Sequence, residues 1–288
     1  MKKWATVLIG AWMALSLAAC GGQAGSNDAS KTAANNDPTS NNAAVNEQEA
    51  AVPTLDELIA KSSEASKTLK SFSSEASIQQ NISVEAGEQS QEQQLTTSIK
   101  MDVIKDPLTA YQEMKVEMPG QEAQTIKQYF TNDSIYSQVG EQWVTIPEEQ
   151  TQPLIEQMKA SVNPEQELEQ FKSITEDTKI TAEGDNYIIN ATVSGDNVKE
   201  LAKSVLQQNG TDPQMQTMID QMDITSMTMK YMVNQETYLP TGTDLNMVMN
   251  MEQEGQKMKM DMKMTSTFSN HNTVENIEVP QEVLDSAK

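Results

Sequence analysis

Apolar and polar residues alternate over long stretches of this chain, and this alternation constrains the fold more than any other feature. A period of two places every second side chain on the same face of a β-strand. The pattern is clear from Phe72 to Val84, and it recurs in three long stretches between Thr225 and Phe268. Each of these strands has one apolar face, which has to be buried against another part of the chain.

Turn signals divide the alternating stretches into strands. Gly87, Pro107 and Pro119-Gly120 separate the first ones, so residues 72–146 are predicted to form an antiparallel meander whose second strand begins at Leu95. Two more strands are predicted at 174–182 and 187–193. The last three are predicted at 225–233, 243–251 and 258–268, with Thr225 on the same face as Met227.

Helical spacing appears between the groups of strands. Thr54 and Glu57 form a capping-box pattern at the start of an amphipathic helix. Further helices are predicted at 147–172, 195–207 and 212–222. Long antiparallel strands with one apolar face need a cover, and these helices can supply it. The sequence therefore predicts one α+β domain, a large curved antiparallel sheet with helices covering its concave face.

The first twenty residues have the pattern of an export signal that ends in a cysteine. Lys2 and Lys3 precede an apolar run, and residues 17–20 read Leu-Ala-Ala-Cys. This motif resembles the lipobox of bacterial lipoproteins, which implies that the Cys20 sulfur carries a diacylglycerol group and that the chain is cut before it. Two acyl chains are enough for stable anchoring in a membrane. The alternative is a plain secretion signal with a chance cysteine.

The chain divides into three parts on this interpretation. Residues 1–19 are the lipoprotein signal peptide, and residues 20–52 are the lipidated cysteine and a disordered linker rich in Asn, Ala, Ser and Gln. Residues 53–288 form the folded domain. We expect a monomer that is lipid-anchored at the outer face of the cell membrane, in a Gram-positive organism.

The charge balance argues against nucleic acid as a partner. The chain carries a formal net charge of −22, and all of its basic residues are lysine. An acidic surface repels phosphate backbones, and a chain without arginine lacks the bidentate fork that grips phosphates and carboxylates. We expect no nucleic-acid partner, and we interpret the acidity as a source of solubility and of spacing from an anionic envelope.

Catalysis has little support in the sequence. Cys20 is the only cysteine and His271 the only histidine, so the domain can hold no disulfide, zinc–thiolate site or cysteine nucleophile. The sequence contains no G-x-S-x-G elbow, HExxH motif, Walker A loop or GxGxxG fingerprint. Only a glycosidase-like pair of carboxylates stays open, because acidic residues are abundant. We expect neither enzymatic activity nor a bound cofactor or metal, and we expect His271 at the surface.

Methionine is over-represented, with 19 residues against four phenylalanines. Two runs of alternating methionines, 247–251 and 258–264, each lie on one strand face and are predicted to pair across the turn at Glu254-Gly255. Three interpretations are open. The methionines can fill an ordinary core, line a deformable cavity for apolar ligands, or bind a soft metal such as Cu(I) through their thioethers.

Three local features stand out along the domain: the passage from helix to strand at 69–72, the turn at 234–240, and the ending Ile-Glu-Val-Pro at 277–280. Together they resemble the LolA-like lipoprotein carriers and the related mycobacterial cell-wall lipoproteins. The overall layout is similar to that of uncharacterised Gram-positive lipoproteins. The resemblance covers residues 54–288 and implies an open half-barrel with a hydrophobic cavity for acyl chains or lipoproteins. The arginine with which the LolA carrier holds its helices closed has no counterpart here.

The leading hypothesis is a membrane-anchored lipoprotein that binds or carries a lipid or another apolar molecule in a hydrophobic cavity. The candidate lining residues are Phe72, Ile78, Met101, Met227, Met229, Met247, Met249, Met251, Met258, Met260, Met262 and Met264. The alternative is a surface interaction or sensor domain with a filled core that binds an envelope protein as its partner.

Overall fold

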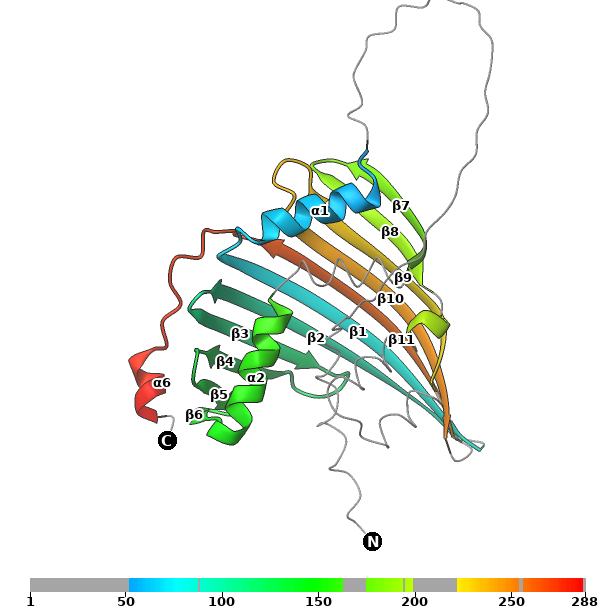
Figure 1. Cartoon of the computed structure of the whole chain (residues 1–288). Helices are drawn as coiled ribbons and strands as arrows, with labels where there is room; N and C mark the ends of the chain where they lie inside the picture. The colour runs from blue at the N-terminus through cyan, green and yellow to red at the C-terminus, as the bar shows by residue number, and fades with distance from the viewer. Residues whose placement is uncertain are drawn as a thin grey trace, which may run out of the picture.

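Eleven strands form one continuous antiparallel sheet in the computed structural model (Figure 1), in the order β6-β5-β4-β3-β2-β1-β11-β10-β9-β8-β7. The structure describes residues 52–87, 89–162, 175–193, 195–198, 222–253 and 256–286. The strands are β1 (Ser71–Ala86), β2 (Gln89–Lys105), β3 (Leu108–Glu117), β4 (Gln124–Phe130), β5 (Ile135–Val139), β6 (Gln142–Thr145), β7 (Thr175–Glu183), β8 (Asn186–Val193), β9 (Met222–Asn234), β10 (Pro240–Gln253) and β11 (Gln256–Ser269). The helices are α1 (Leu55–Ser66), α2 (Glu148–Ser161) and α6 (Gln281–Ser286).

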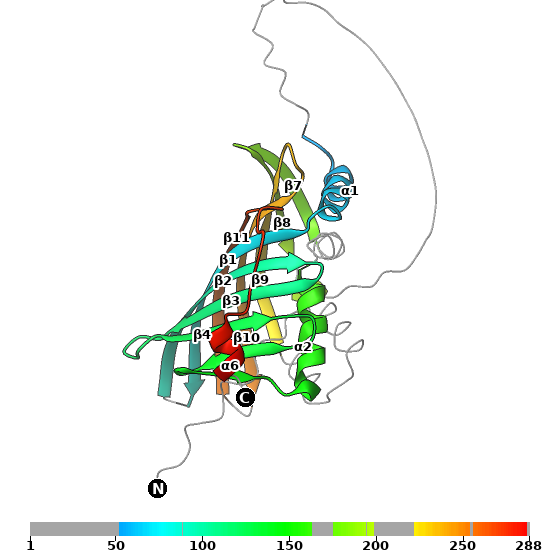
Figure 2. The ribbon, with the colours of Figure 1, turned by 90° about the vertical axis from the view of Figure 1, so that its left-hand side faces the viewer.

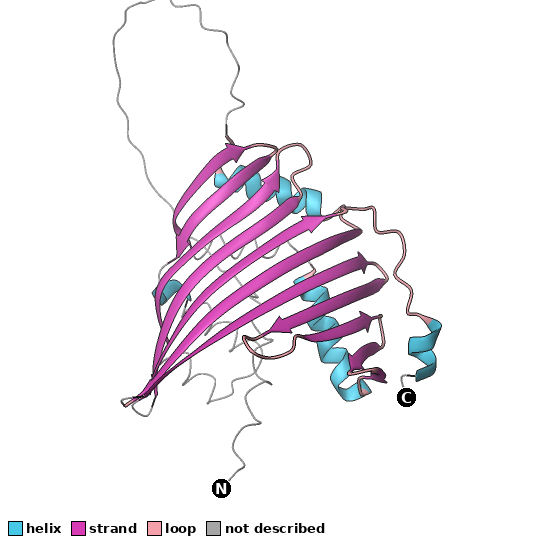
Figure 3. Cartoon of the chain, turned by 180° about the vertical axis from the view of Figure 1, so that it is seen from behind, coloured by secondary structure: helices cyan, strands magenta, loops and turns pink. Residues whose placement is uncertain are grey.

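The sheet is curved and open. Strands β6 and β7 lie at its two ends and do not pair with each other. Helices α1 and α2 lie on the concave side of the sheet (Figure 2). Figure 3 shows the sheet from the opposite, convex side. Helix α6 lies beside β6 and contacts it. The predicted α+β fold, an open half-barrel with helices on its concave face, is therefore confirmed.

Helix α1 begins where the capping box predicts. The Glu57 amide donates to the Thr54 hydroxyl at 3.3 Å, and the Thr54 amide donates to the Glu57 carboxylate at 3.0 Å. These two bonds satisfy amide groups that have no partner within the helix. The helix buries Leu58 and Ile59 against a cluster that includes Tyr187, Ile189, Tyr231 and Val233. One end of the concave face is thus covered by α1.

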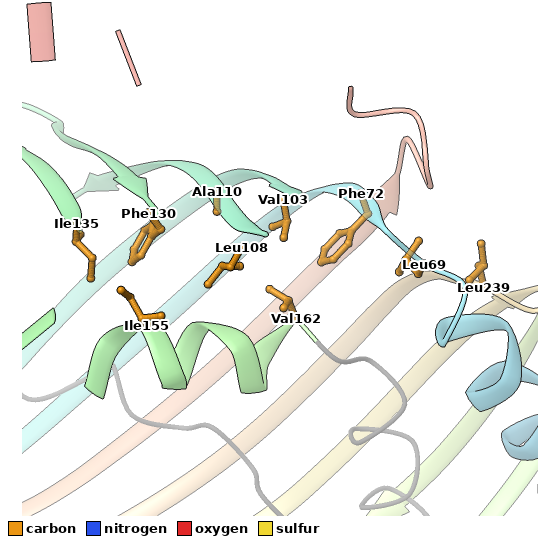
Figure 4. Close-up of a cluster of buried hydrophobic side chains, with 10 residues drawn as sticks. All are labelled: Leu69, Phe72, Val103, Leu108, Ala110, Phe130, Ile135, Ile155, Val162 and Leu239. Carbon is orange, nitrogen blue, oxygen red and sulfur yellow. The ribbon is translucent and has the colours of Figure 1, made fainter. Parts of the chain in front are cut away.

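Helix α2 covers the other end of the concave face. Its Ile155 is fully buried, and Thr151 donates a hydrogen bond to the Ile146 carbonyl at 3.0 Å near the start of the helix. Figure 4 shows Ile155 and Val162 directed toward the strands. The cluster consists of Leu69, Phe72, Val103, Leu108, Ala110, Phe130, Ile135, Ile155, Val162 and Leu239.

The centre of the sheet joins the two ends of the chain. Strand β1 pairs with β2 through the first hairpin, and on its other side it pairs with β11 from Ser73–Ser269 to Ala86–Gln256. The meander β2–β6 and the later strands β7–β10 are therefore connected through the β1–β11 ladder. This joint brings inner-face residues of the early and late strands side by side.

Two local predictions are wrong, and a third is right only in part. Strand β2 begins at Gln89 instead of Leu95, because its polar start pairs with the far end of β1. In β9 a register shift leaves Thr225 without a partner on β10, so Thr225 is exposed and Ile224 is buried instead. His271, predicted at the surface, is partly buried, and no hydrogen bond reaches its Nε2 within the described part of the chain.

Several predicted segments lie outside the described residues. They are the signal peptide, Cys20, nearly all of the linker, the second half of the 147–172 helix and most of the two helices predicted between 195 and 222. Among the residues that are described, no helix combines the length and apolarity needed to span a membrane.

Candidate functional site

Strand register gathers the methionines of the late strands on the concave face. Met262 lies opposite Met247, and Met260 lies opposite Met249, so the predicted pairing of the two methionine runs is confirmed. Across the next ladder, Met227 lies opposite Met247. The methionine surface is the set of Met227, Met229, Met247, Met249, Met251, Met258, Met260, Met262 and Met264.

Burial divides the methionine surface into two parts. Met227, Met249 and Met260 are only 6%, 3% and 2% exposed to solvent, and they pack together with Val193 and Ile224. The other six methionines are only partly buried. A packed apolar patch is therefore bordered by flexible thioether side chains that still have accessible area, and such side chains adapt to ligands of different shapes.

Three candidate residues come from the early strands, and they lie in two different parts of the concave face. Ile78 lies opposite Met264, beside the methionine surface. Phe72 and Met101 belong to the cluster under α2, where Phe72 also makes an edge-to-face contact with Phe268 at 6.1 Å between ring centroids. The structure therefore joins Ile78 to the methionines and assigns Phe72 and Met101 to the packed core beneath α2.

Among the described side chains of α1 and α2, none belongs to the packed methionine patch of Met227, Met249 and Met260. The side chains of α1 pack in the cluster with Tyr187 and Tyr231, and those of α2 pack in the cluster with Phe72. Among the described residues outside the sheet, Val198 packs against the methionine patch. The methionine surface therefore adjoins the core beneath α1, because Met229 packs against both clusters.

A polar side chain, Gln80, borders this apolar surface. Gln80 pairs with Met262 across the β1–β11 ladder, and its amide lies 3.8 Å from the sulfur of Met260. A single amide in an apolar site can orient a polar group of a ligand. The alternation placed Gln80 on this face, but the sequence offered no sign that it borders the methionines, because the contact depends on the pairing of distant strands.

The described residues hold no group of three or more His, Cys, Asp or Glu side chains that could bind a metal ion. His271 interacts with the backbone of Pro240, and burial lowers the pKa of its imidazole below the usual value. The thioether hypothesis for a soft metal is not tested by these observations. Cys20, the predicted site of lipid attachment, lies outside the described residues.

The convex face carries two hollows that sequence reasoning missed. The first has a volume of about 250 Å³ and is lined in part by Ser73, Asp102, Tyr111 and Asn270. Ser73 donates to Asp102 and accepts from Asn270. Burial, followed by the nearby Glu113 carboxylate, raises the pKa of Tyr111 to about 12, so this hydroxyl stays protonated at neutral pH. The second hollow has a volume of about 290 Å³.

The fold and its inner surface define a class: an α+β domain with an open antiparallel sheet and an apolar concave face partly covered by helices. Residues 54–288 match a family model described as a family of unknown function, DUF6612. The chain belongs to this family. No curated protein matches it.

Three solved structures resemble the domain. LprF from Mycobacterium bovis has 14% identity, a TM-score of 0.39 and coverage of 80% of this chain and 99% of its own. A DUF1329 family protein from Desulfovibrio piger has 10% identity, a TM-score of 0.24 and coverage of 77% and 95%. A LolA superfamily protein from Nitrosomonas europaea has 10% identity, a TM-score of 0.19 and coverage of 80% and 97%. The three structures include a mycobacterial lipoprotein and a LolA superfamily protein, the two groups that the local sequence features resemble.

Proposed function

We propose that this protein binds a lipid or another apolar molecule on the concave face of its sheet, at the methionine surface. The observation that carries the proposal is the set of partly buried methionines that borders the packed patch of Met227, Met249 and Met260. Their remaining apolar area is removed from water when a ligand covers it, and each square ångström so buried contributes about 25 cal/mol. Gln80 is positioned to orient a polar group of that ligand.

We further propose that the domain works at the outer face of the cell membrane, held there through Cys20. The Leu-Ala-Ala-Cys sequence at residues 17–20 and the linker that follows it support this assignment. Anchoring would keep the concave face close to a supply of acyl chains. Binding is the whole activity under this proposal, with no chemical step.

Native mass spectrometry of the Cys20→Ser chain, purified without detergent, tests the proposal. We expect a co-purifying lipid, or uptake of added palmitate, at close to one molecule per chain. Met262→Gln, which places an amide on the inner face of β11, should reduce uptake by about tenfold because a polar group is desolvated without a partner. Lys263→Gln, its exposed neighbour on the outer face, is the matched control. An apo mass that stays unchanged with palmitate would refute the proposal.

A second function, an interaction or sensor domain with a filled core, is favoured by one observation. Met227, Met249 and Met260 are already packed with Val193 and Ile224, as in an ordinary core. This alternative predicts that no lipid is retained and that cross-linking in cells captures an envelope protein. It also predicts that Met262→Gln and Lys263→Gln leave the mass spectrum of the purified chain equally free of ligand.

A further inference from the structure

The second hollow on the convex face spans β7, β8, β9 and β10, on the side of the sheet opposite the methionine surface. Its lining side chains of polar character are Lys179, Asn190, Thr192, Thr228, Lys230 and Asn246. These side chains end in ammonium, amide or hydroxyl groups, and none ends in a carboxylate. In a chain with a net charge of −22, this composition is a local reversal of the overall charge. We name it the lysine hollow.

Strand register places the two lysines on either side of one amide. Asn190 pairs with Lys179 on β7 and with Lys230 on β9, so the three residues form one cross-strand row. Neighbouring strands are about 4.8 Å apart, so the two lysine backbones are separated by about 10 Å. Side chains as long as lysine can reach a shared ligand across that distance. Thr192 and Thr228 pair in the adjacent row.

Other lysines on the same face have carboxylate partners. Lys100 lies 3.4 Å from Glu75, Lys127 lies 3.8 Å from Glu113, and Lys259 lies 3.2 Å from Asp261. Within the described residues, no ion pair of this kind includes Lys179 or Lys230. Asp244, the β10 partner of Lys230 by register, is the nearest carboxylate along the row and makes no ion pair with it.

Two strand irregularities lie toward one end of the hollow. The β7–β8 register shifts between Thr175 and Asp177, and the β9–β10 register shifts between Val248 and Met249. Bulges of this kind bend a strand and change the direction of side chains, and they are common beside binding sites. The regular pleat is therefore interrupted beside the hollow, at residues that do not line it.

We propose that the lysine hollow binds a phosphate group, with Lys179 and Lys230 supplying charge and Asn190, Asn246 and the two threonines supplying hydrogen-bond donors. A phosphate offers several acceptor oxygens to this set of donors. A lysine ammonium binds phosphate as a point charge and lacks the bidentate geometry of arginine. Binding is therefore weak and sensitive to salt. The phosphate belongs either to a small soluble ester or to the headgroup of an anionic lipid.

The test uses the full-length chain carrying Cys20→Ser, labelled with ¹⁵N. Glycerol 3-phosphate is titrated at low salt while the amide signals of Asn190 and Thr228 are followed, and sedimentation is measured with vesicles of phosphatidylcholine alone or mixed with phosphatidylglycerol. The Lys179→Gln/Lys230→Gln variant should bind about 25-fold more weakly, from about fivefold for each charge. Lys257→Gln/Lys259→Gln removes the same charge from the part of β11 that lies away from the hollow and is the matched control.

A response to glycerol 3-phosphate that is lost in Lys179→Gln/Lys230→Gln and kept in the control supports the site with a soluble ester as its source. Binding only to vesicles with phosphatidylglycerol, with the same dependence on the two lysines, supports it with a lipid headgroup. No binding to either probe, or equal losses in both double variants, overturns it. None of these variants alters the methionine surface, so palmitate uptake reports on that surface separately.

Discussion

Phe72 connects the early and late parts of the chain through one ring. It retains 4% of its exposure, packs beneath α2 and contacts Phe268 of β11. Phe72→Ala should lower the free energy of unfolding by about 3–5 kcal/mol, because it removes apolar contacts and leaves a cavity. Urea unfolding followed by circular dichroism measures the change. Val139→Ala, at a side chain that is 64% exposed, is the control and should change stability by less than about 0.5 kcal/mol.

The partly buried imidazole of His271 should make stability depend on pH. Its pKa is lowered in the folded chain by burial, so between the folded and unfolded pKa values the unfolded chain binds more protons. The contribution of His271 to stability is fully present above the ordinary pKa of 6.5 and is lost as the pH falls below it.

His271→Asn keeps an amide near the position of Nδ1 and removes the titration. We expect the free energy of unfolding of this variant to change less than that of the wild type between about pH 7 and pH 5.5. Urea midpoints measured at several pH values provide the comparison. Parallel pH profiles for the two chains would show that His271 is as accessible to protons in the folded as in the unfolded state.

The capping box at the start of helix α1 should stabilise that helix. Thr54→Ala removes the hydroxyl that accepts from the Glu57 amide and should cost about 1 kcal/mol of stability. Thr54→Ser retains the hydroxyl and should stay close to the wild type. Thermal unfolding of the two variants measures the difference, and an equal loss in both would assign the effect to the lost methyl group instead of the cap.

The elements that the sequence predicts well are those with a long regular period. The alternation from Phe72 to Val84 and the methionine runs of β10 and β11 each repeat often enough to identify a strand and its inner face. The polar start of β2 has no such signal, because Gln89 is in a strand only through its pairing with Ala86. The exposure of Thr225 depends on a bulge, and a bulge is set by the neighbouring strand.

The methionine surface could also be predicted only in part from the sequence. A short turn between two alternating runs implied that Met247 and Met262 pair, and they do. The burial of Met260 and the partial exposure of Met262 depend on tertiary packing, which the pattern does not encode. The lysine hollow includes Lys179 and Lys230, which are distant in sequence. The two residues come into one row because each pairs with Asn190 of β8.

Across the whole molecule, protection of amides should follow the order of the strands. The β1–β11 ladder lies at the centre of the sheet, so its hydrogen bonds open only when the sheet separates into two parts. We expect the amides of Ile78 to Ile82 to exchange with deuterium more slowly than those at the β6 and β7 ends. Hydrogen exchange measured by mass spectrometry tests this order, and faster exchange in β1 than in β6 would contradict it.

The same central ladder determines when the protein can acquire its structure. Strand β1 is made early, but its partner β11 follows only near the end of synthesis. Until Met258 to Phe268 emerge, β1 has a free edge and the inner face of the meander lacks its neighbour. Contacts between such distant segments form slowly. The central ladder therefore cannot form, and the sheet cannot be completed, until nearly the whole chain has been made.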